Sequence, residues 1–467
     1  MRKALSLLVL MFAVITLWAA EGAATYSGTV PVIFINTDNG EAVSSKTEYL
    51  NAKAYILSNG YHGLDNLGSQ EQMVNLQIRG RGNYTWNSFD KKPYRLKFEK
   101  KQEVLGMAAN KHFALLAHAD DDLAFLRNTV GFEISRRMNM PFTPSQVPVE
   151  VVLNGEYIGL YMLTETIRID KSRIDIEPQA DNETDPELIQ GGWLVEIDNY
   201  GDESQIQFNV DDLPLNTFYI THKTPEILSE SQYSYLYDVF STFLSDVYTS
   251  DKSQALWKNY IDMESLARYY IVMEATDHYE AFLGSCYMYK KSANDGWTFG
   301  TVWDFGHAFD RNPNGNDGKY KLGNYIYNDI PMPESIIKEI MRFPEFKQMV
   351  KTIWQQESEN IYSGLNAFID TFIGDITVAA ANDAVRWPEY GTGDTQQRAQ
   401  IVKDRLEYKR QFLNSKWNGS TQIVSVSDDG YEPYIYNKVW YDLQGRRVSP
   451  PLKPGIYVVD GKKMMVR

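Results

Sequence analysis

The sequence predicts an α+β fold, in which a β-rich part of the chain precedes a mainly helical part. Residues 25–165 hold short runs of β-branched and aromatic residues separated by glycine-rich turns, which is typical of strands. Residues 166–418 repeat apolar side chains at steps of three and four, as the buried face of a helix requires. Residues 419–430 are polar and indicate a linker, and residues 431–467 return to short β-rich runs. We therefore expect one large α+β domain over 25–418 and a small C-terminal β module.

The first part is expected to contain several strands and one helix. A tight hairpin is predicted at Asn154-Gly155, because this dipeptide between two β-rich runs is a strong turn signal. A helix is predicted over 123–138, where apolar side chains recur at helical spacing. The expected strands cover residues 30–36, 76–79, 94–98, 149–153 and 157–163.

The second part is expected to be helical around one β-hairpin. Asp262 is placed to cap a helix that ends just before Asp277. Two strands, at 287–290 and 297–303, then flank a turn at 294–296. The predicted helices cover residues 233–247, 266–274, 334–355 and 395–416.

The composition argues against several classes of protein. A formal net charge of −15 disfavours nucleic acid and anionic lipid as partners, because both bind basic surfaces. A hydrophobic content of 43% argues against a disordered chain. Cys286 is the only cysteine, so no intramolecular disulfide can form, and the scattered histidines show no metal-ligand spacing.

The N-terminus has the parts of a secretory signal peptide. Arg2 and Lys3 precede an apolar run over 4–20, and small residues follow it. A retained membrane anchor is the alternative, but the run is short for a bilayer span and no basic cluster follows it. We therefore expect residues 1–24 to be removed, and the mature protein to be secreted, periplasmic or on the cell surface. No membrane span is expected after cleavage.

Several motifs carry the groups that phosphoryl transfer needs. That reaction uses carboxylates to bind Mg²⁺, cations and amides to bind phosphates, and a base to orient the acceptor hydroxyl. Protein kinases present these groups in a fixed order along the chain, from a glycine-rich turn to Asp-Phe-Gly. This chain has the same order: a turn at 80–83, three lysines, a helix, residues 163–165, then Asp277 and a hairpin, then residues 304–306. The three lysines are Lys91, Lys92 and Lys97.

Each of these motifs also has a plainer explanation. Residues 304–306 can be a turn at the end of a strand, the glycine-rich turn can be a simple loop, and Asp277 can be a solvated acid. Their occurrence together and in order favours the phosphoryl-transfer interpretation.

The same motifs resemble those of the CotH kinase family, which is named for a spore-coat protein. The longest match lies at 78–98, where Ile-Arg-Gly-Arg-Gly-Asn-Tyr-Thr-Trp precedes Lys-Lys-Pro-Tyr-Arg-Leu-Lys-Phe. Further matches lie at 105–107, 113–117, Asp122, 126–128, 153–161, Glu165, 303–306, 386–388 and the helix that reaches Arg405. The resemblance covers about residues 30–415 and involves several motifs in order.

The resemblance implies an atypical protein-kinase-like, two-lobed fold, with a β-rich N-lobe over 25–165 and a mainly helical C-lobe over 166–418. It also implies transfer of phosphate from ATP, with Mg²⁺ or Mn²⁺, to Ser or Thr of a secreted or surface protein. Asp304 would then bind the metal ion, and Asp277 would be the acid of the catalytic loop. The candidates for binding phosphates are Arg79, Arg81, Lys92 and Lys97, and either Lys92 or Lys97 can be the strand lysine.

One position departs from the family pattern. Many relatives carry Asn shortly after the catalytic-loop Asp, and here that place is Ser285, directly before Cys286-Tyr287. Serine offers one neutral oxygen on a shorter side chain, so a metal ion at Ser285 would be bound more weakly. Two other functions stay open: a catalytically inactive kinase-like protein that binds a partner or forms a scaffold at the cell surface, and a glycan-active protein with Asp277 or Glu280 as the acid.

The C-terminal residues resemble the terminal β module of exported Bacteroidetes proteins, which in some cases serves secretion and surface attachment. The resemblance rests on residues 439–448 and 455–463, with turns at 444–445 and 460–461. A plain β cap without a sorting role explains the pattern equally well.

Overall fold

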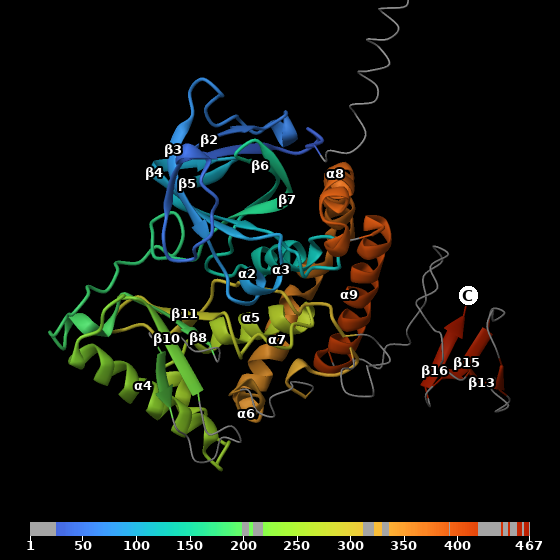
Figure 1. Cartoon of the computed structure of the whole chain (residues 1–467). Helices are drawn as coiled ribbons and strands as arrows, with labels where there is room; N and C mark the ends of the chain where they lie inside the picture. The colour runs from blue at the N-terminus through green and yellow to red at the C-terminus, as the bar shows by residue number, and fades with distance from the viewer. Residues whose placement is uncertain are drawn as a thin grey trace, which may run out of the picture.

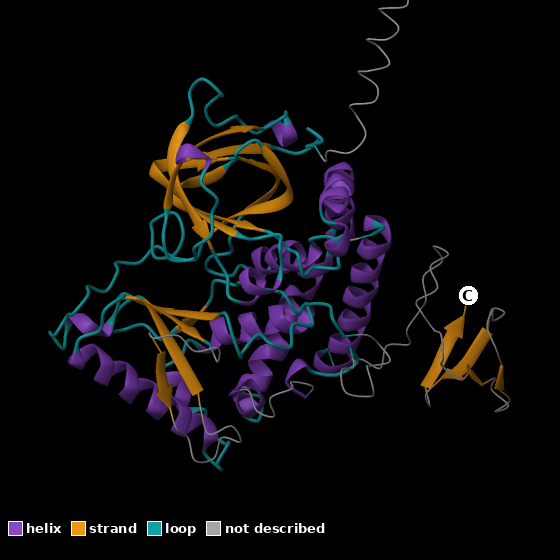
Figure 2. Ribbon diagram, in the orientation of Figure 1, coloured by secondary structure: helices purple, strands orange, loops and turns teal. Residues whose placement is uncertain are grey.

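The computed structural model describes residues 25–198, 205–208, 218–311, 322–328, 336–391 and 393–418, and four short strands between residues 440 and 466. These residues form a mixed α+β structure, as the sequence predicts (Figure 1; Figure 2). The expected signal peptide at 1–24 and linker at 419–430 lie outside the described residues.

A closed β-barrel forms the first part of the described chain. Its strands lie in the order β1-β2-β3-β4-β5-β7-β6, and β1 closes the barrel by pairing in parallel with β6. Side chains alternate along each strand, so Leu96 and Phe98 pack in the barrel core while Arg95 and Lys97 lie on its outer face. The strands are β1 Val32–Thr37, β2 Leu50–Leu57, β3 Val74–Gly80, β4 Tyr94–Val104, β5 Met107–Leu116, β6 Gln146–Leu153 and β7 Glu156–Glu165.

The strands expected in this part are confirmed, and so is the hairpin between β6 and β7. Asn154 and Gly155 have φ of 52° and 81°, the left-handed backbone that a two-residue turn of this kind requires. Helix α3 (Leu126–Arg137) is also present, but it begins at Leu126 rather than at residue 123. Ala124 and Phe125 have φ of 57° and 63°, which a right-handed helix cannot contain. The glycine-rich turn between β3 and β4 contains a short helix, α2 (Tyr84–Ser88).

A second, antiparallel sheet lies among the helices, with strand order β12-β11-β8-β10-β9. The hairpin of β11 and β12 was expected, although β12 is only two residues long and residues 300–303 leave the sheet. The other three strands were not predicted. Every residue of β8 is buried, so its sequence lacks the alternation by which a strand is recognised. The strands are β8 Trp193–Ile197, β9 Gln205–Phe208, β10 Phe218–Thr224, β11 Cys286–Lys290 and β12 Thr298–Phe299.

Helix α5 is the central helix of the second part. It begins after Asp262, whose carboxylate accepts hydrogen bonds from the backbone N–H of Glu264 and Ser265, as the predicted cap requires. It packs against α3, α7 and α9, and most of its residues are buried. The helices of this part are α4 Glu230–Tyr248, α5 Met263–Ala275, α6 Ile336–Ile340, α7 Pro344–Tyr362, α8 Leu365–Arg386 and α9 Thr395–Trp417. Within the described ranges, no single helix is long and apolar enough to cross a membrane, whereas α7 and α8 taken together, bent by 40°, reach that length and composition.

Helix α8, which the sequence did not reveal, fastens the helices to the barrel (Figure 1). Its Asp383 accepts a hydrogen bond of 2.8 Å from the backbone N–H of Leu160 and forms a buried ion pair of 2.8 Å with Lys91. Gly159 makes this approach possible, because a Cβ there would lie 2.2 Å from the Asp383 carboxylate. Trp387 then donates from Nε1 to the carbonyl of Ile158 at 2.9 Å. The motif at 386–388 is therefore a docking element for strand β7.

The C-terminal strands expected from the sequence are present as a small antiparallel sheet. Its order is β14-β13-β15-β16, and the pairing joins these strands to one another. The strands are β13 Trp440–Tyr441, β14 Arg447–Val448, β15 Gly455–Val459 and β16 Lys462–Val466. The domain boundaries stay predictions.

Candidate functional site

Asp304 lies in an ordered loop that is anchored to helix α3. Its backbone is left-handed, with φ of 55°, and its side chain is exposed, whereas the next residue, Phe305, is fully buried. Asn128 of α3 accepts a hydrogen bond of 2.8 Å from the backbone N–H of Phe305. The Phe305 ring covers Gly131 and meets Phe132 edge to face. The motifs at 126–128 and 303–306, which are far apart in the sequence, thus form one unit that presents the Asp304 carboxylate.

Gly131 is expected to be essential for this unit. A Cβ at Gly131 would lie 2.5 Å from the Phe305 ring, whereas a Cβ at Gly374 of helix α8 meets nothing within 4 Å. Replacing a helical glycine by alanine favours the helix by about 1 kcal/mol. Gly374→Ala should therefore stabilise the protein by about 1 kcal/mol, while Gly131→Ala should destabilise it by about 1–3 kcal/mol through the clash. Denaturant unfolding of both variants measures the difference, and equal stabilities would contradict this packing.

Arg127 of α3 joins the loop after β5 to the loop after Asp304. Its guanidinium lies 3.2 Å from Asp121, 2.7 Å from Asp122 and 2.5 Å from Asp310. Burial by itself lowers the pKa of Arg127, but the carboxylates of Asp121 and Asp310 raise it, so the side chain stays charged. Both loops are consequently fixed on the same side of α3, and the charge of Asp304 acts on Asp120 of the first loop.

Asp120 is a second carboxylate at the site, and the sequence did not single it out. The Asp120 side chain is exposed, yet the protein around it partly desolvates the carboxylate and raises its pKa. The negative charges of Asp304 and Asp121 raise the pKa further, against the effect of His118. Two carboxylates that repel each other in this way are stabilised by a bound cation. No group of three or more His, Cys, Asp or Glu is arranged to bind a metal ion within the described ranges. The pair fits Mg²⁺ nevertheless, because this ion is commonly bound by one or two carboxylates together with substrate phosphates.

Among the predicted phosphate-binding residues, Arg81 is the one that contacts Trp303 and feels the charge of Asp304. Its guanidinium lies 5.5 Å from the ring centre of Trp303, the residue before Asp304. Burial lowers the pKa of Arg81, and Asp304 is the strongest charge acting in the opposite direction. Arg81 follows Gly80, where a Cβ would lie 2.3 Å from the Trp86 ring. The glycine-rich turn therefore folds against Trp86 and turns Arg81 toward Asp304.

The other predicted phosphate-binding residues lie further along the same part of the barrel. Arg79 donates to the backbone carbonyls of Lys46 and Gly80, and Arg79 and Lys97 lie 5.0 Å and 5.7 Å from the ring centre of Tyr49. Lys92 donates to the carbonyl of Trp86 at 2.7 Å. The Lys92 ammonium group is thus hydrogen-bonded to the backbone of the loop between β3 and β4, whereas Lys97 lies on the outer face of the barrel.

Asp277 lies at the end of α5 in an environment that differs from that of a solvated acid. Only 1% of its surface is exposed, and its carboxylate is 2.8 Å from Arg311 Nε and 2.9 Å from Lys409 Nζ. Lys409 also lies 2.8 Å from Glu274, so two cations and two carboxylates form a buried network. The backbone carbonyl of Thr276 accepts a hydrogen bond of 3.0 Å from the backbone N–H of Phe309, so the chain returns to the end of α5 after the hairpin. The carboxylate of Asp277 is therefore already paired with the side chains of Arg311 and Lys409.

Ser285 and His307 are two further polar residues of this part of the chain, and His307 belongs to the segment that follows Asp304. Ser285 is half-buried directly before β11, with a left-handed φ of 52°. His307 accepts or donates hydrogen bonds of 2.9 Å with Asp310 and Tyr279 and lies 3.4 Å from Glu280. The hydrogen bond to Asp310 raises the pKa of His307. Sequence motifs did not indicate this polar group, because its members come from different loops.

His278, behind the Asp304 loop, should make stability depend on pH. Burial, followed by the charge of His307, lowers the pKa of His278 to about 3. Below about pH 6.5 the unfolded chain binds a proton at this histidine and the folded chain does not. Stability should therefore fall as the pH decreases through this window, by about 1.4 kcal/mol per pH unit. Between about pH 6 and about pH 4, the free energy of unfolding of His278→Gln should fall by about 2 kcal/mol less than that of the parent protein. Denaturant unfolding at both pH values measures this difference, and identical losses would contradict the assignment.

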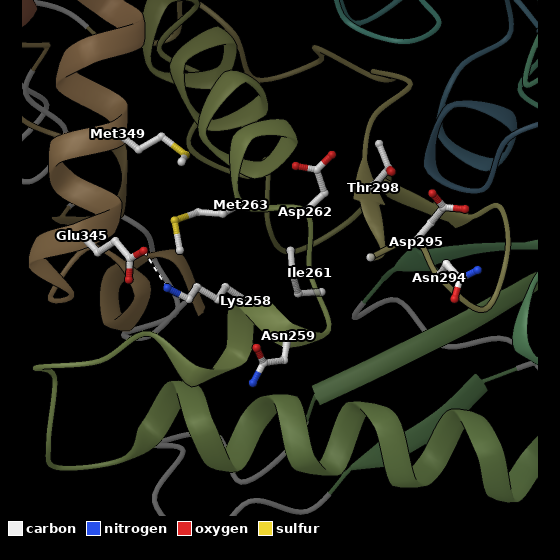
Figure 3. A pocket seen from close by; sticks show the side chains of 11 residues that line it. Lys258, Asn259, Ile261, Asp262, Met263, Asn294, Asp295, Thr298, Glu345 and Met349 are labelled. Carbon is white, nitrogen blue, oxygen red and sulfur yellow. Dashed lines mark hydrogen bonds and ion pairs between the residues drawn. The ribbon is translucent and has the colours of Figure 1, made fainter.

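A separate pocket of about 540 Å³ lies between the start of α5, the β11–β12 turn and the start of α7 (Figure 3). Lys258 and Glu345 form an ion pair of 2.7 Å across one side of it. Asp262 in its wall is the cap of α5. None of the residues proposed above for phosphoryl transfer lines this pocket, so we assign it no part in that chemistry.

Comparison with known families agrees with the resemblance seen in the motifs. The family model described as CotH kinase protein matches residues 78–413. Because this match spans well over half of the 467 residues, the chain belongs to the CotH kinase family. A search of curated proteins found no match to the chain.

Proposed function

We propose that this protein is an exported, two-lobed kinase of the CotH type, which transfers phosphate from ATP to Ser or Thr of secreted or surface proteins. The observation that supports it best is that Arg81 lies 5.5 Å from the ring centre of Trp303, directly before Asp304, and that the charge of Asp304 acts on both Arg81 and Asp120, which come from two other segments. The barrel would act as the N-lobe and the helical part as the C-lobe. Two carboxylates beside a cation are the groups that binding a metal–triphosphate complex requires.

In this proposal Asp304 and Asp120 bind Mg²⁺ or Mn²⁺, and Arg81 donates hydrogen bonds to the phosphates. Arg79 and Lys97 add positive charge along the barrel, and Lys92 supports the turn that carries Arg81. The metal ion, when bound, neutralises negative charge on the phosphates. The acceptor hydroxyl gives its proton to Asp277 or to solvent, and its oxygen forms the new bond to the γ-phosphorus. The bond between that phosphorus and the bridging oxygen breaks, and ADP leaves with the bonding electrons.

Asp277 stays our proposed catalytic-loop acid, with a condition that its surroundings impose. Arg311 and Lys409 already contact this carboxylate, at 2.8 Å and 2.9 Å, so its oxygens are not open to the acceptor hydroxyl. Asp277 would have to release one of these cations to take the proton. If it does not, it acts as a positioning residue, and it holds the segment 277–285 in place.

Protection of the mature protein from thermal unfolding by ATP tests the proposal. A ligand that binds the folded state alone raises the melting temperature as its concentration increases. We expect protection with ATP and Mg²⁺ together, and much less with ATP and a chelator. No protection in either condition would leave a nucleotide-independent binding or scaffold protein as the better account.

The alternative of an inactive, kinase-like scaffold at the cell surface has one observation in its favour, namely Ser285. The left-handed backbone at this position suits asparagine better than serine, and an amide oxygen reaches further than a hydroxyl. We therefore expect Ser285→Asn to raise the melting temperature slightly and to strengthen Mg²⁺-dependent ATP binding several-fold, measured by calorimetry. Ser285→Ala is the control, and equal ATP affinities in both variants would exclude a role for position 285 in the site.

A further inference from the structure

A cationic cluster extends along the barrel beyond the Asp304 site. Arg95 and Lys97 are two residues apart on β4, so their side chains lie on the same outer face. Their cross-strand partners are Arg79 on β3 and His112 on β5. Arg168, in the segment after β7, acts electrostatically on both Arg95 and His112. These five residues are called the barrel cluster below.

The barrel cluster has more donors than acceptors. In the part of the chain that the structure describes, no carboxylate forms an ion pair with Arg95, Lys97 or Arg168, and the nearby Asp170 is bound by Lys101 at 2.9 Å. Arg95 Nε and His112 Nδ1 are buried and have no hydrogen-bond partner among the described residues. Burial and the charges of Arg168 and Arg95 lower the pKa of His112 to about 3. Glu226 and Asp170 act on part of the cluster, but among the described residues neither forms an ion pair with Arg95 or Arg168. Like charges held together with unpartnered donors indicate a site for an anionic ligand.

The cluster faces the second sheet and continues away from Asp304. Burial lowers the pKa of Arg81 and of Arg95, and Tyr287 of β11 acts on both in the opposite direction. Asp304 acts on Arg81, whereas the cations that interact with Arg95 are Arg79 and Arg168. The strip of positive charge is therefore longer than the part next to Asp304.

We propose that Arg95, Lys97 and Arg168 bind carboxylate side chains of the acceptor protein, so that the kinase favours a Ser or Thr flanked by acidic residues. This inference rests on the proposed function and names its substrate class. A nucleotide is anionic at one end and has a neutral base at the other, which needs an apolar slot rather than more cations. A chain of net charge −15 repels an acidic segment over most of its surface. A local basic strip lowers this repulsion and allows an acidic segment to bind there.

Equilibrium binding of two labelled peptides to the full mature protein tests the proposal. Both peptides contain one Ser, flanked by Glu in the first and by Gln in the second. The protein should bind the Glu peptide at least about 10-fold more tightly, and Arg168→Gln should remove most of that preference. Lys171→Gln is the matched control, because Lys171 is an exposed cation of the same segment. ATP affinity with Mg²⁺ is measured in parallel.

The outcomes separate the two proposals. Equal binding of the two peptides, or the same loss in Lys171→Gln, would overturn acidic docking. A loss of ATP affinity in Arg168→Gln that equals its loss of peptide affinity would assign the cluster to the nucleotide and also overturn it. If the parent protein binds no ATP, the kinase proposal fails, whereas a Glu preference that depends on Arg168 would still support docking of an acidic partner.

Discussion

Asp304→Asn should abolish Mg²⁺-dependent ATP binding while leaving the fold intact. The side chain is exposed, and its loop is anchored by Asn128 and Phe305. Its own carboxylate accepts one hydrogen bond of 3.3 Å from the backbone N–H of Gly306, which the amide oxygen of Asn can also accept. The substitution keeps the shape of the residue and removes the charge that would bind the metal ion. Altering the groups that surround a metal ligand already lowers metal affinity about 10- to 100-fold. The loss of a ligand itself should therefore weaken metal-dependent ATP binding at least about 100-fold.

Calorimetric titration of the parent and Asp304→Asn with ATP and Mg²⁺ provides the measurement. Asp65→Asn serves as the control, because Asp65 is an exposed acid of the barrel. It should bind like the parent. Equal affinity in Asp304→Asn and the parent would remove Asp304 from the site.

Asp277→Asn should destabilise the protein by about 3–5 kcal/mol. Removing one charge from a buried ion network leaves the opposite charges uncompensated, and this usually lowers the free energy of unfolding by about 3–5 kcal/mol. Here the partners are Arg311 and Lys409, both buried, with Glu274 as the other carboxylate. A solvated acid at the end of a helix would instead change stability by less than about 1 kcal/mol.

A double-mutant cycle makes this result specific to the network. Lys409→Met removes one of the cations that Asp277 compensates, so the cost of Asp277→Asn should be smaller in that background. Denaturant unfolding of the four proteins gives the coupling energy. Additive effects would mean that the two residues do not interact, and a stable, inactive Asp277→Asn would favour a catalytic role over a structural one.

Local signals predicted much of the fold. The Asn154-Gly155 turn, the Asp262 cap and the β11–β12 hairpin depend on residues close in sequence, and each is present. Strand β8 and helix α8 were missed for different reasons. All residues of β8 are buried, so no alternation marks it, and the importance of α8 comes from its contacts with distant Leu160 and Lys91.

The sequence predicted those parts of the site that lie in recognisable motifs. Residues 126–128 and 303–306 stood out in the sequence, and the structure brings them together through Asn128 and Phe305. The roles of neighbouring charges were not visible, since charge pairing depends on tertiary contacts. Arg127 holds the loop of Asp120 and the segment after Asp304 through Asp121 and Asp310. Asp277 pairs with Lys409, which is more than a hundred residues away in sequence.

Incubation of the mature protein with γ-labelled ATP, Mg²⁺ or Mn²⁺ and an acceptor protein tests the central claim most directly. The account predicts that label appears on Ser or Thr of the acceptor, that a chelator prevents this, and that Asp304→Asn transfers none. Absence of transfer by the parent protein under conditions in which it binds ATP, or equal transfer by Asp304→Asn, would contradict it.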